Sequence, residues 1–226
     1  MLPVKTNNRK NVLQVENQGG SAKCVAYVAT TLLENLLTQK IGLWQNLSPD
    51  FLYDRRTPVA GMYPHEVFEI MQKDGCLTFH DYLINPHQED LAKNFKIKDW
   101  AQISTVEKAK EHLAEGRMLL VVNGTHAQTL VDYDDQLEEF TMLNSYGEGW
   151  GFYQAKYSDF NLGLAYVAIG VEPERLKGYI YQGQWAKNAL YGIVDWLILN
   201  KQARDYIKMC SVGVLVILIG KALGFL

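Results

Sequence analysis

The chain has 226 residues, enough for one sizeable domain and an appendage, and its 48% hydrophobic and 21% charged residues indicate a globular rather than a disordered protein. The net charge of −3 is uneven, because residues 1–173 carry 15 basic and 22 acidic side chains whereas residues 174–226 carry 7 basic and 3 acidic ones. The acidic main part excludes a basic surface of the kind that binds nucleic acid, so no nucleic-acid partner is expected.

The first half of the chain has apolar residues at helical spacing. Ser21 is expected to cap the first and central helix, and Ser48 with Pro49 the second. Residues 12–15 are a candidate short strand, whereas residues 77–104 show only weak periodicity. The predicted helices cover residues 21–38, 48–55, 64–73 and 105–115.

The second half changes from helical spacing to short apolar runs separated by turns. Helices followed by an antiparallel sheet predict the α+β class, and we assign residues 1–173 to one such domain. The predicted strands cover residues 118–123, 127–133, 139–143, 151–154 and 165–171.

The C-terminal part has a different character. Residues 174–206 are predicted to form an amphipathic helical linker, which either packs on the domain or lies in a membrane interface. Residues 207–226 contain a 12-residue uncharged run, 209–220, and reach the roughly 20 residues that span a bilayer if Lys221 extends to the far headgroups. We expect a membrane anchor with the domain on the cytoplasmic side, because basic residues precede it. The alternative is a helix buried in an oligomer.

The cysteines and histidines indicate neither a disulfide framework nor a zinc site. Three cysteines, Cys24, Cys76 and Cys210, make no disulfide framework, and the N-terminus lacks an apolar signal core, so we do not expect a disulfide-rich secreted protein. No Cys/His cluster has zinc-ligand spacing, and His80 and His87 are interpreted as surface or loop residues. We therefore expect neither a metal nor another cofactor.

Cys24 has the setting of a reactive thiol. It follows a Gly-Gly-Ser turn and begins a helix, where the positive end of the helix dipole and the adjacent Lys23 favour a thiolate. The simpler alternative is a buried cysteine at the start of a core helix. Downstream, His126 begins a strand, and Asn144 opens the stretch Asn-Ser-Tyr-Gly-Glu-Gly-Trp-Gly. Cysteine, histidine and asparagine in this order are what a Cys-His-Asn hydrolase needs.

These motifs resemble those of the papain-like cysteine proteases. That family has Gln-Gly-x-x-x-x-Cys at its central helix, His-Ala at a strand start and Asn-Ser-Trp-Gly-x-x-Trp-Gly, and residues 18–24, 126–127 and 144–151 have the same spacing. Further similarity, at residues 47–54 among others, extends the resemblance over roughly residues 10–172. It implies a two-lobe fold, a helical lobe plus an antiparallel β lobe with the cleft between them.

The resemblance also implies roles for individual residues. Cys24 would be the nucleophile, His126 its acid–base partner, and Asn144 the residue that orients the imidazole. The Gln18 side chain and the Cys24 backbone N–H would form the oxyanion hole.

Gly61 and Thr125 would bind substrate, Gly61 by pairing with its backbone. Tyr146 or Trp150 would shield the His–Asn contact from water. The sequence departs from the family at Lys23, where a small residue is common, and at Val25, where tryptophan is usual. It also has Tyr146 for a tryptophan, and only Gly61 of a glycine pair, which leaves rate and substrate subsites open.

The resulting prediction is a cysteine endopeptidase that cleaves protein or peptide substrates through a thioester acyl-enzyme. One alternative keeps the fold and changes the substrate to the cell wall, although such amidases and peptidases have a shorter Cys–His separation than the 102 residues here. The other is a catalytically idle papain-like scaffold used for binding at a membrane.

Overall fold

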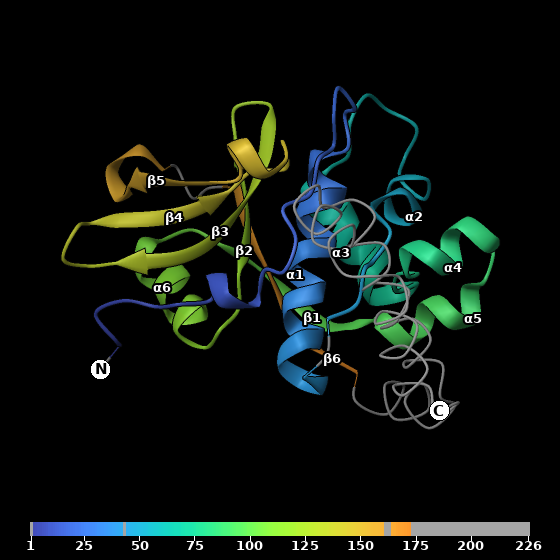
Figure 1. Ribbon diagram of the computed structural model, residues 1–226, viewed down its shortest axis with the longest axis horizontal. Coiled ribbons are helices and arrows are strands. Elements are labelled where there is room, and N and C mark those ends of the chain that lie inside the picture. Colours follow the sequence, from blue (N-terminus) through green and yellow to red (C-terminus); the bar gives the residue numbers. More distant parts are fainter. Residues whose placement is uncertain (1, 43, 161–163, 173–226) are drawn as a thin grey trace, which may run out of the picture.

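The computed structural model describes residues 2–42, 44–160 and 164–172 (Figure 1). The predicted linker at 174–206, the predicted anchor at 207–226 and Cys210 lie outside the described residues. Within the described ranges, no helix combines the length and the hydrophobicity needed to cross a bilayer.

One side of the molecule is helical, and α1 lies between the other helices of that side and the sheet (Figure 1). Its side chains from Val25 to Leu37 are almost all buried, which is why this helix is apolar around most of its circumference. The helices on this side are α1 (Cys24–Ile41), α2 (Pro49–Tyr53), α3 (Pro64–Lys73), α4 (Phe79–Ile84) and α5 (Glu89–Ala92).

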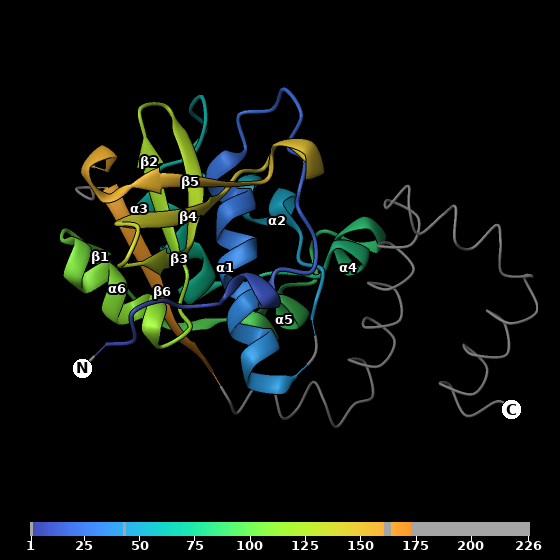
Figure 2. The same cartoon turned by 60° about the vertical axis from the view of Figure 1, so that its left-hand side comes forward.

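The other side is a six-stranded antiparallel sheet in the order β1-β6-β2-β3-β4-β5. Alternate residues of β2 face two separate cores: Leu120 packs towards α1, whereas Leu119 and Val121 pack towards α6. Figure 2 shows α1 and α6 on opposite sides of the sheet. The remaining elements are β1 (Ile97–Ile103), α6 (Val106–Ala114), β2 (Leu119–Asn123), β3 (His126–Asp134), β4 (Glu139–Leu143), β5 (Phe152–Lys156) and β6 (Ala165–Val171).

The predicted α+β class is therefore confirmed, and the predicted helices and strands are present with small shifts. The prediction for the start of the central helix was wrong. Helix α1 begins at Cys24 with Lys23 as its N-cap residue, and no side chain caps it. The Ser21 hydroxyl instead donates to the carbonyl oxygen of Gln18 at 2.6 Å, so it closes the preceding turn. Residues 12–15 form no strand.

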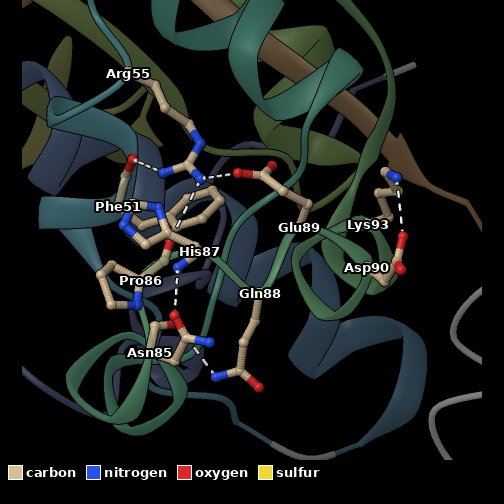
Figure 3. Close-up of polar contacts among 9 residues, drawn as sticks. All are labelled: Phe51, Arg55, Asn85, Pro86, His87, Gln88, Glu89, Asp90 and Lys93. Atoms are coloured by element: carbon tan, nitrogen blue, oxygen red, sulfur yellow. Dashed lines mark hydrogen bonds and ion pairs between the residues drawn. The ribbon is translucent and has the colours of Figure 1, made fainter.

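The region of weak periodicity, 77–104, contains α4, α5 and the edge strand β1. Arg55, just after α2, fastens the loop between α4 and α5 to the helical side (Figure 3). Its guanidinium donates to the carbonyl oxygen of Phe51 at 3.2 Å and to the Glu89 carboxylate at 2.6 Å, and it lies 3.5 Å from the centre of the Phe51 ring. His87 is exposed in this loop, as predicted.

The N-terminal segment crosses from the sheet to α1. Near its start, Thr6 N–H donates to the carbonyl oxygen of Tyr133 at 3.1 Å, and farther on the Asn11 amide donates to Asn35 of α1 at 3.1 Å. The segment then returns to the sheet, where residues 16–18 pair with residues 145–147. This pairing brings the two ends of the candidate site together.

Candidate active site

Cys24 is the first residue of α1 and is partly buried. The chain reaches it through a tight turn, in which Gly19 has a φ of +57° and Ser21 N–H donates to the Gln18 carbonyl oxygen at 3.2 Å. Positive φ is available to glycine at little cost, so the Gly-Gly pair lets the chain turn immediately before the helix. The backbone N–H of Val25 is directed at the thiol, as expected for the unpaired donors of a first helical turn.

His126 and Asn144 come from neighbouring strands of the sheet. His126 begins β3, and Asn144 directly follows β4, which pairs with β3. The His126 Nε2 and Asn144 Oδ1 atoms are 2.7 Å apart. The Tyr146 ring stacks on the imidazole with ring centres 4.8 Å apart and planes within 10°. Tyr146 thus lies against one face of the imidazole, whereas Trp150 is 78% exposed.

The thiol and the imidazole are coupled to each other across the two halves of the molecule. Burial raises the pKa of the Cys24 thiol. Its hydrogen bond with His126, the N–H of Ala127 and the charge of the imidazolium lower the pKa by more than burial raises it, so that the pKa lies below the usual thiol value. The pKa of His126 is raised, chiefly by the bond with Cys24, against burial and with help from Asn144. Since Nε2 is held by Asn144, Nδ1 is the nitrogen left for the thiol. Both shifts favour a thiolate–imidazolium pair.

Gln18 is held in place by two side-chain hydrogen bonds. Its Oε1 accepts from the Ser145 hydroxyl at 2.6 Å, and its Nε2 donates to the carbonyl oxygen of Ser21 at 2.7 Å. A side-chain amide carries two N–H donors, so these bonds engage only one of the two N–H groups of Gln18. Ser145 was missed in the sequence because the serine of an Asn-Ser pair carries no signal of the partner that it contacts 127 positions away.

Lys23 does not act on the thiol as its position in the sequence suggested. Its ammonium lies 2.5 Å from the Asp50 carboxylate and 5.4 Å from the centre of the Tyr53 ring. The carboxylate cancels most of the positive potential that an isolated lysine would exert on Cys24. The structure therefore leaves the thiolate to be stabilised by His126 and backbone N–H groups.

The two predicted substrate-binding residues come from different parts of the fold, Gly61 from the loop between α2 and α3 and Thr125 from the sheet. Gly61 has a φ of +85°, and a side chain there would come within 4.0 Å of the Ala22 carbonyl oxygen, so it lies beside the turn that leads to Cys24. Its carbonyl oxygen accepts from Arg56 Nε at 2.8 Å. Thr125 is exposed in the β2–β3 turn, directly before His126.

The other described cysteine has the opposite character. Cys76 is fully buried, and desolvation moves its pKa far above the usual thiol value. A neutral, inaccessible thiol is expected to be unreactive. The two thiols therefore differ both in exposure and in the direction in which their pKa is shifted.

The comparisons with known proteins show the fold. No family model and no curated protein matches the chain. Among solved structures, it is similar to xylellain, a cysteine protease from Xylella fastidiosa, with a TM-score of 0.65 at 18% identity over 76% of this chain and 88% of the other. It is also similar to the ragweed pollen cysteine protease Amb a 11 in its proform, with a TM-score of 0.63 at 20% identity over 75% of this chain and 66% of that one.

A third similar structure is the Carica candamarcensis cysteine protease CMS1MS2 in complex with E-64. Its TM-score is 0.63 at 18% identity, and the match covers 76% of this chain and all of that chain. The chain thus has the papain-like fold, as the sequence motifs predicted.

Proposed function

We propose that this chain is a cysteine endopeptidase that hydrolyses peptide bonds in protein or peptide substrates. The observation that carries the proposal is the continuous contact from Cys24 to His126 to Asn144, with one residue from the helical side and two from the sheet. A buried structural cysteine would not need a lowered pKa or an oriented imidazole. The papain-like fold supports the same activity by analogy.

In the proposed reaction, the Cys24 thiolate attacks the carbonyl carbon of the scissile peptide bond. The oxyanion that forms accepts hydrogen bonds from the Gln18 amide and the Cys24 backbone N–H. Collapse of this intermediate breaks the C–N bond, and the His126 imidazolium protonates the departing amine, which leaves a thioester on Cys24. His126, now neutral, removes a proton from a water molecule that attacks the thioester, and the carboxylic acid product leaves with the thiol restored.

Substrate would lie along Gly61, whose backbone can pair with an extended peptide. Because Arg56 already donates to the Gly61 carbonyl oxygen, this carbonyl offers its second lone pair, and the position of the Gly61 loop is fixed before substrate arrives. Thr125, exposed beside His126, would contact a side chain of the substrate.

The test is labelling of the full chain with a peptidyl epoxide, followed by intact mass measurement. We expect one adduct, located on Cys24 by peptide mapping. Cys24→Ala should abolish both labelling and turnover, and Cys76→Ala, its matched control, should keep both. Failure of the wild-type protein to label would favour the idle scaffold. Cleavage of peptidoglycan but not casein would favour the cell-wall enzyme.

We also propose that residues 207–226 attach the protein to a membrane, with the enzyme on the cytoplasmic side. The support is the uncharged run 209–220 and the basic residues that precede it. The full-length protein should then remain with membranes after carbonate extraction. Replacing Leu215 and Ile217 with aspartate should release it, and a full-length protein that is soluble and monodisperse without detergent would contradict this proposal.

A further inference from the structure

The proposed substrate-binding residue Gly61 has an arginine beside it. Arg56 Nε donates to the Gly61 carbonyl oxygen at 2.8 Å, and Arg56 Nη1 donates to the carbonyl oxygen of Tyr53, the last residue of α2, at 2.7 Å. The guanidinium carbon lies 3.5 Å from the centre of the Tyr53 ring. These three contacts hold the guanidinium against the backbone along which the substrate would lie.

The space next to Gly61 is open on the side where a side chain would project. Among the described residues other than its neighbours in the chain, a Cβ atom at this glycine would meet only the carbonyl oxygen of Ala22, at 4.0 Å. Ala22 belongs to the turn that leads to Cys24, and the loop residues 57–60 are all exposed. A peptide lying along Gly61 towards Cys24 would therefore pass close to the guanidinium.

The charge of Arg56 is not balanced by a carboxylate of the described residues. Within these ranges the guanidinium forms no ion pair, although it is partly buried. The acidic residues closest to it in the sequence have other partners. These partners are Lys23 for Asp50, the Tyr82 hydroxyl for Asp54 and the Thr57 N–H for Glu66.

The guanidinium also keeps donors for a ligand. Two of the five N–H donors of Arg56 are used by Gly61 and Tyr53, and the other three have no acceptor among the described residues. The neighbouring Arg55 differs, because its guanidinium is paired with the Glu89 carboxylate at 2.6 Å (Figure 3). Since a guanidinium binds a carboxylate through charge and hydrogen bonds together, an acidic group of the ligand is the partner that fits Arg56.

The attraction of Arg56 for an acidic group is local. Residues 1–173 carry 15 basic and 22 acidic side chains, so the domain as a whole does not attract an acidic peptide. The other cation near the Tyr53 ring, Lys23, is balanced by Asp50. Charges more than about 8 Å apart are largely screened at physiological salt, so the attraction acts on a substrate side chain next to Arg56 and on no other.

We propose that Arg56 is a specificity-determining residue, which selects substrates with a glutamate or aspartate close to the residue that pairs with Gly61. The substrate carboxylate pairs with the guanidinium through donors that Gly61 and Tyr53 leave free, while the bond to the Gly61 carbonyl oxygen holds the loop. The inference rests on the proposed function, because it names the class of substrate that the proposed peptidase prefers.

The experiment uses the full-length protein and pairs of fluorogenic peptides that differ only by glutamate or glutamine. The residue is placed in turn at each of the three positions on either side of the scissile bond. At pH 7, the wild type should cleave the glutamate peptide with a kcat/KM about three- to fivefold higher than the glutamine peptide at one position or at two adjacent ones. The preference should shrink in about 0.5 M salt, because salt screens the charges.

Three variants separate a role in specificity from a merely structural one. Arg56→Met should bring the ratio of glutamate to glutamine cleavage to about 1 at every position. Arg56→Lys keeps the charge without the planar fork and should retain part of the preference. Arg55→Met, the matched control, removes the adjacent paired cation and should leave the ratio unchanged. The ratio compares two substrates of one protein, so a loss of folded enzyme does not alter it.

A wild-type protein that prefers glutamate at no position would refute the proposal, and so would a preference that survives in Arg56→Met. Fluorescence anisotropy of the same peptides with the uncleaving Cys24→Ala variant measures the preference from binding alone. If the wild type cleaves none of the peptides and does not label with the epoxide, the proposed function fails. The anisotropy still decides the role of Arg56, because equal binding of both peptides, or no binding, would refute it.

Discussion

Replacing Asn144 with alanine tests how the work is divided between the imidazole and its orienting partner. The substitution removes the Oδ1 atom that lies 2.7 Å from His126 Nε2 and leaves the imidazole, the thiol and the Tyr146 ring in place. The imidazole then rotates more freely and pairs with water. Its pKa should fall, since Asn144 is one of the groups that raise it.

The expected loss follows from the energy of this single contact. A hydrogen bond to a charged group contributes about 1.5–3 kcal/mol, which corresponds to a decrease of about 10- to 150-fold in kcat/KM. The stacked Tyr146 still limits the motion of the ring, so we expect the lower half of this range. His126→Ala removes the general acid and base as well as the activation of Cys24, and should cost about 1,000-fold or more.

The assay is hydrolysis of a fluorogenic peptide, with the rate divided by the fraction of reactive Cys24 measured by epoxide titration. This normalisation matters because Asn144 Oδ1 also accepts from Ser145 N–H at 3.1 Å, so the substitution disturbs folding to some extent. Equal losses for Asn144→Ala and His126→Ala would refute the assigned roles. A loss from Asn144→Ala that disappears after normalisation would show a role in stability alone.

Three further predictions follow from contacts of the site and the fold. In Cys24→Ala, the pKa of His126 should fall, because the bond with the thiol is the largest cause that raises it; NMR titration of the imidazole would measure this, and an unchanged value would contradict the pairing. Lys23→Met should change kcat/KM by less than about fivefold, because its charge is already balanced by a partly exposed carboxylate, and a larger loss would restore the role suggested by the sequence. Gly75→Ala should destabilise the fold by about 3 kcal/mol or more in denaturant unfolding, since φ is +83° and the new Cβ would meet a carbonyl oxygen of α5 at 2.0 Å; a loss below about 1 kcal/mol would contradict this geometry.

The sequence predicted the elements whose signals are local. The apolar positions Val67, Ile70 and Met71 identified α3 with its correct bounds, and Ser48 caps α2 as expected, its hydroxyl accepting from Phe51 N–H. The edge strand β1 was missed because its burial does not alternate: Ile97 and Ile103 are buried at its ends, and exposed or half-buried residues lie between them. A strand of this kind is specified by its partner β6 rather than by its own pattern.

The candidate site was predictable in its members but not in its electrostatics. Cys24, His126 and Asn144 stood out by order and spacing, and the structure brings these three together. The charge around them depends on contacts that no short motif records. Asp50, for example, lies 27 positions from Lys23 in the chain. Only the fold shows that the charge of Lys23 is balanced by this carboxylate.

The separation of Cys24 from its partners along the chain has a consequence for how the protein is made. During synthesis, the helix that begins at Cys24 emerges long before β3 and β4, so the thiol of a growing chain has no imidazole beside it. Its pKa then lies at the value of an ordinary cysteine, and no thiolate–imidazolium pair can form until the segment through Asn144 has left the ribosome and docked. The proposed peptidase would therefore be inert towards neighbouring nascent chains until most of its own domain is complete. The order of its catalytic residues along the chain thus delays the onset of activity.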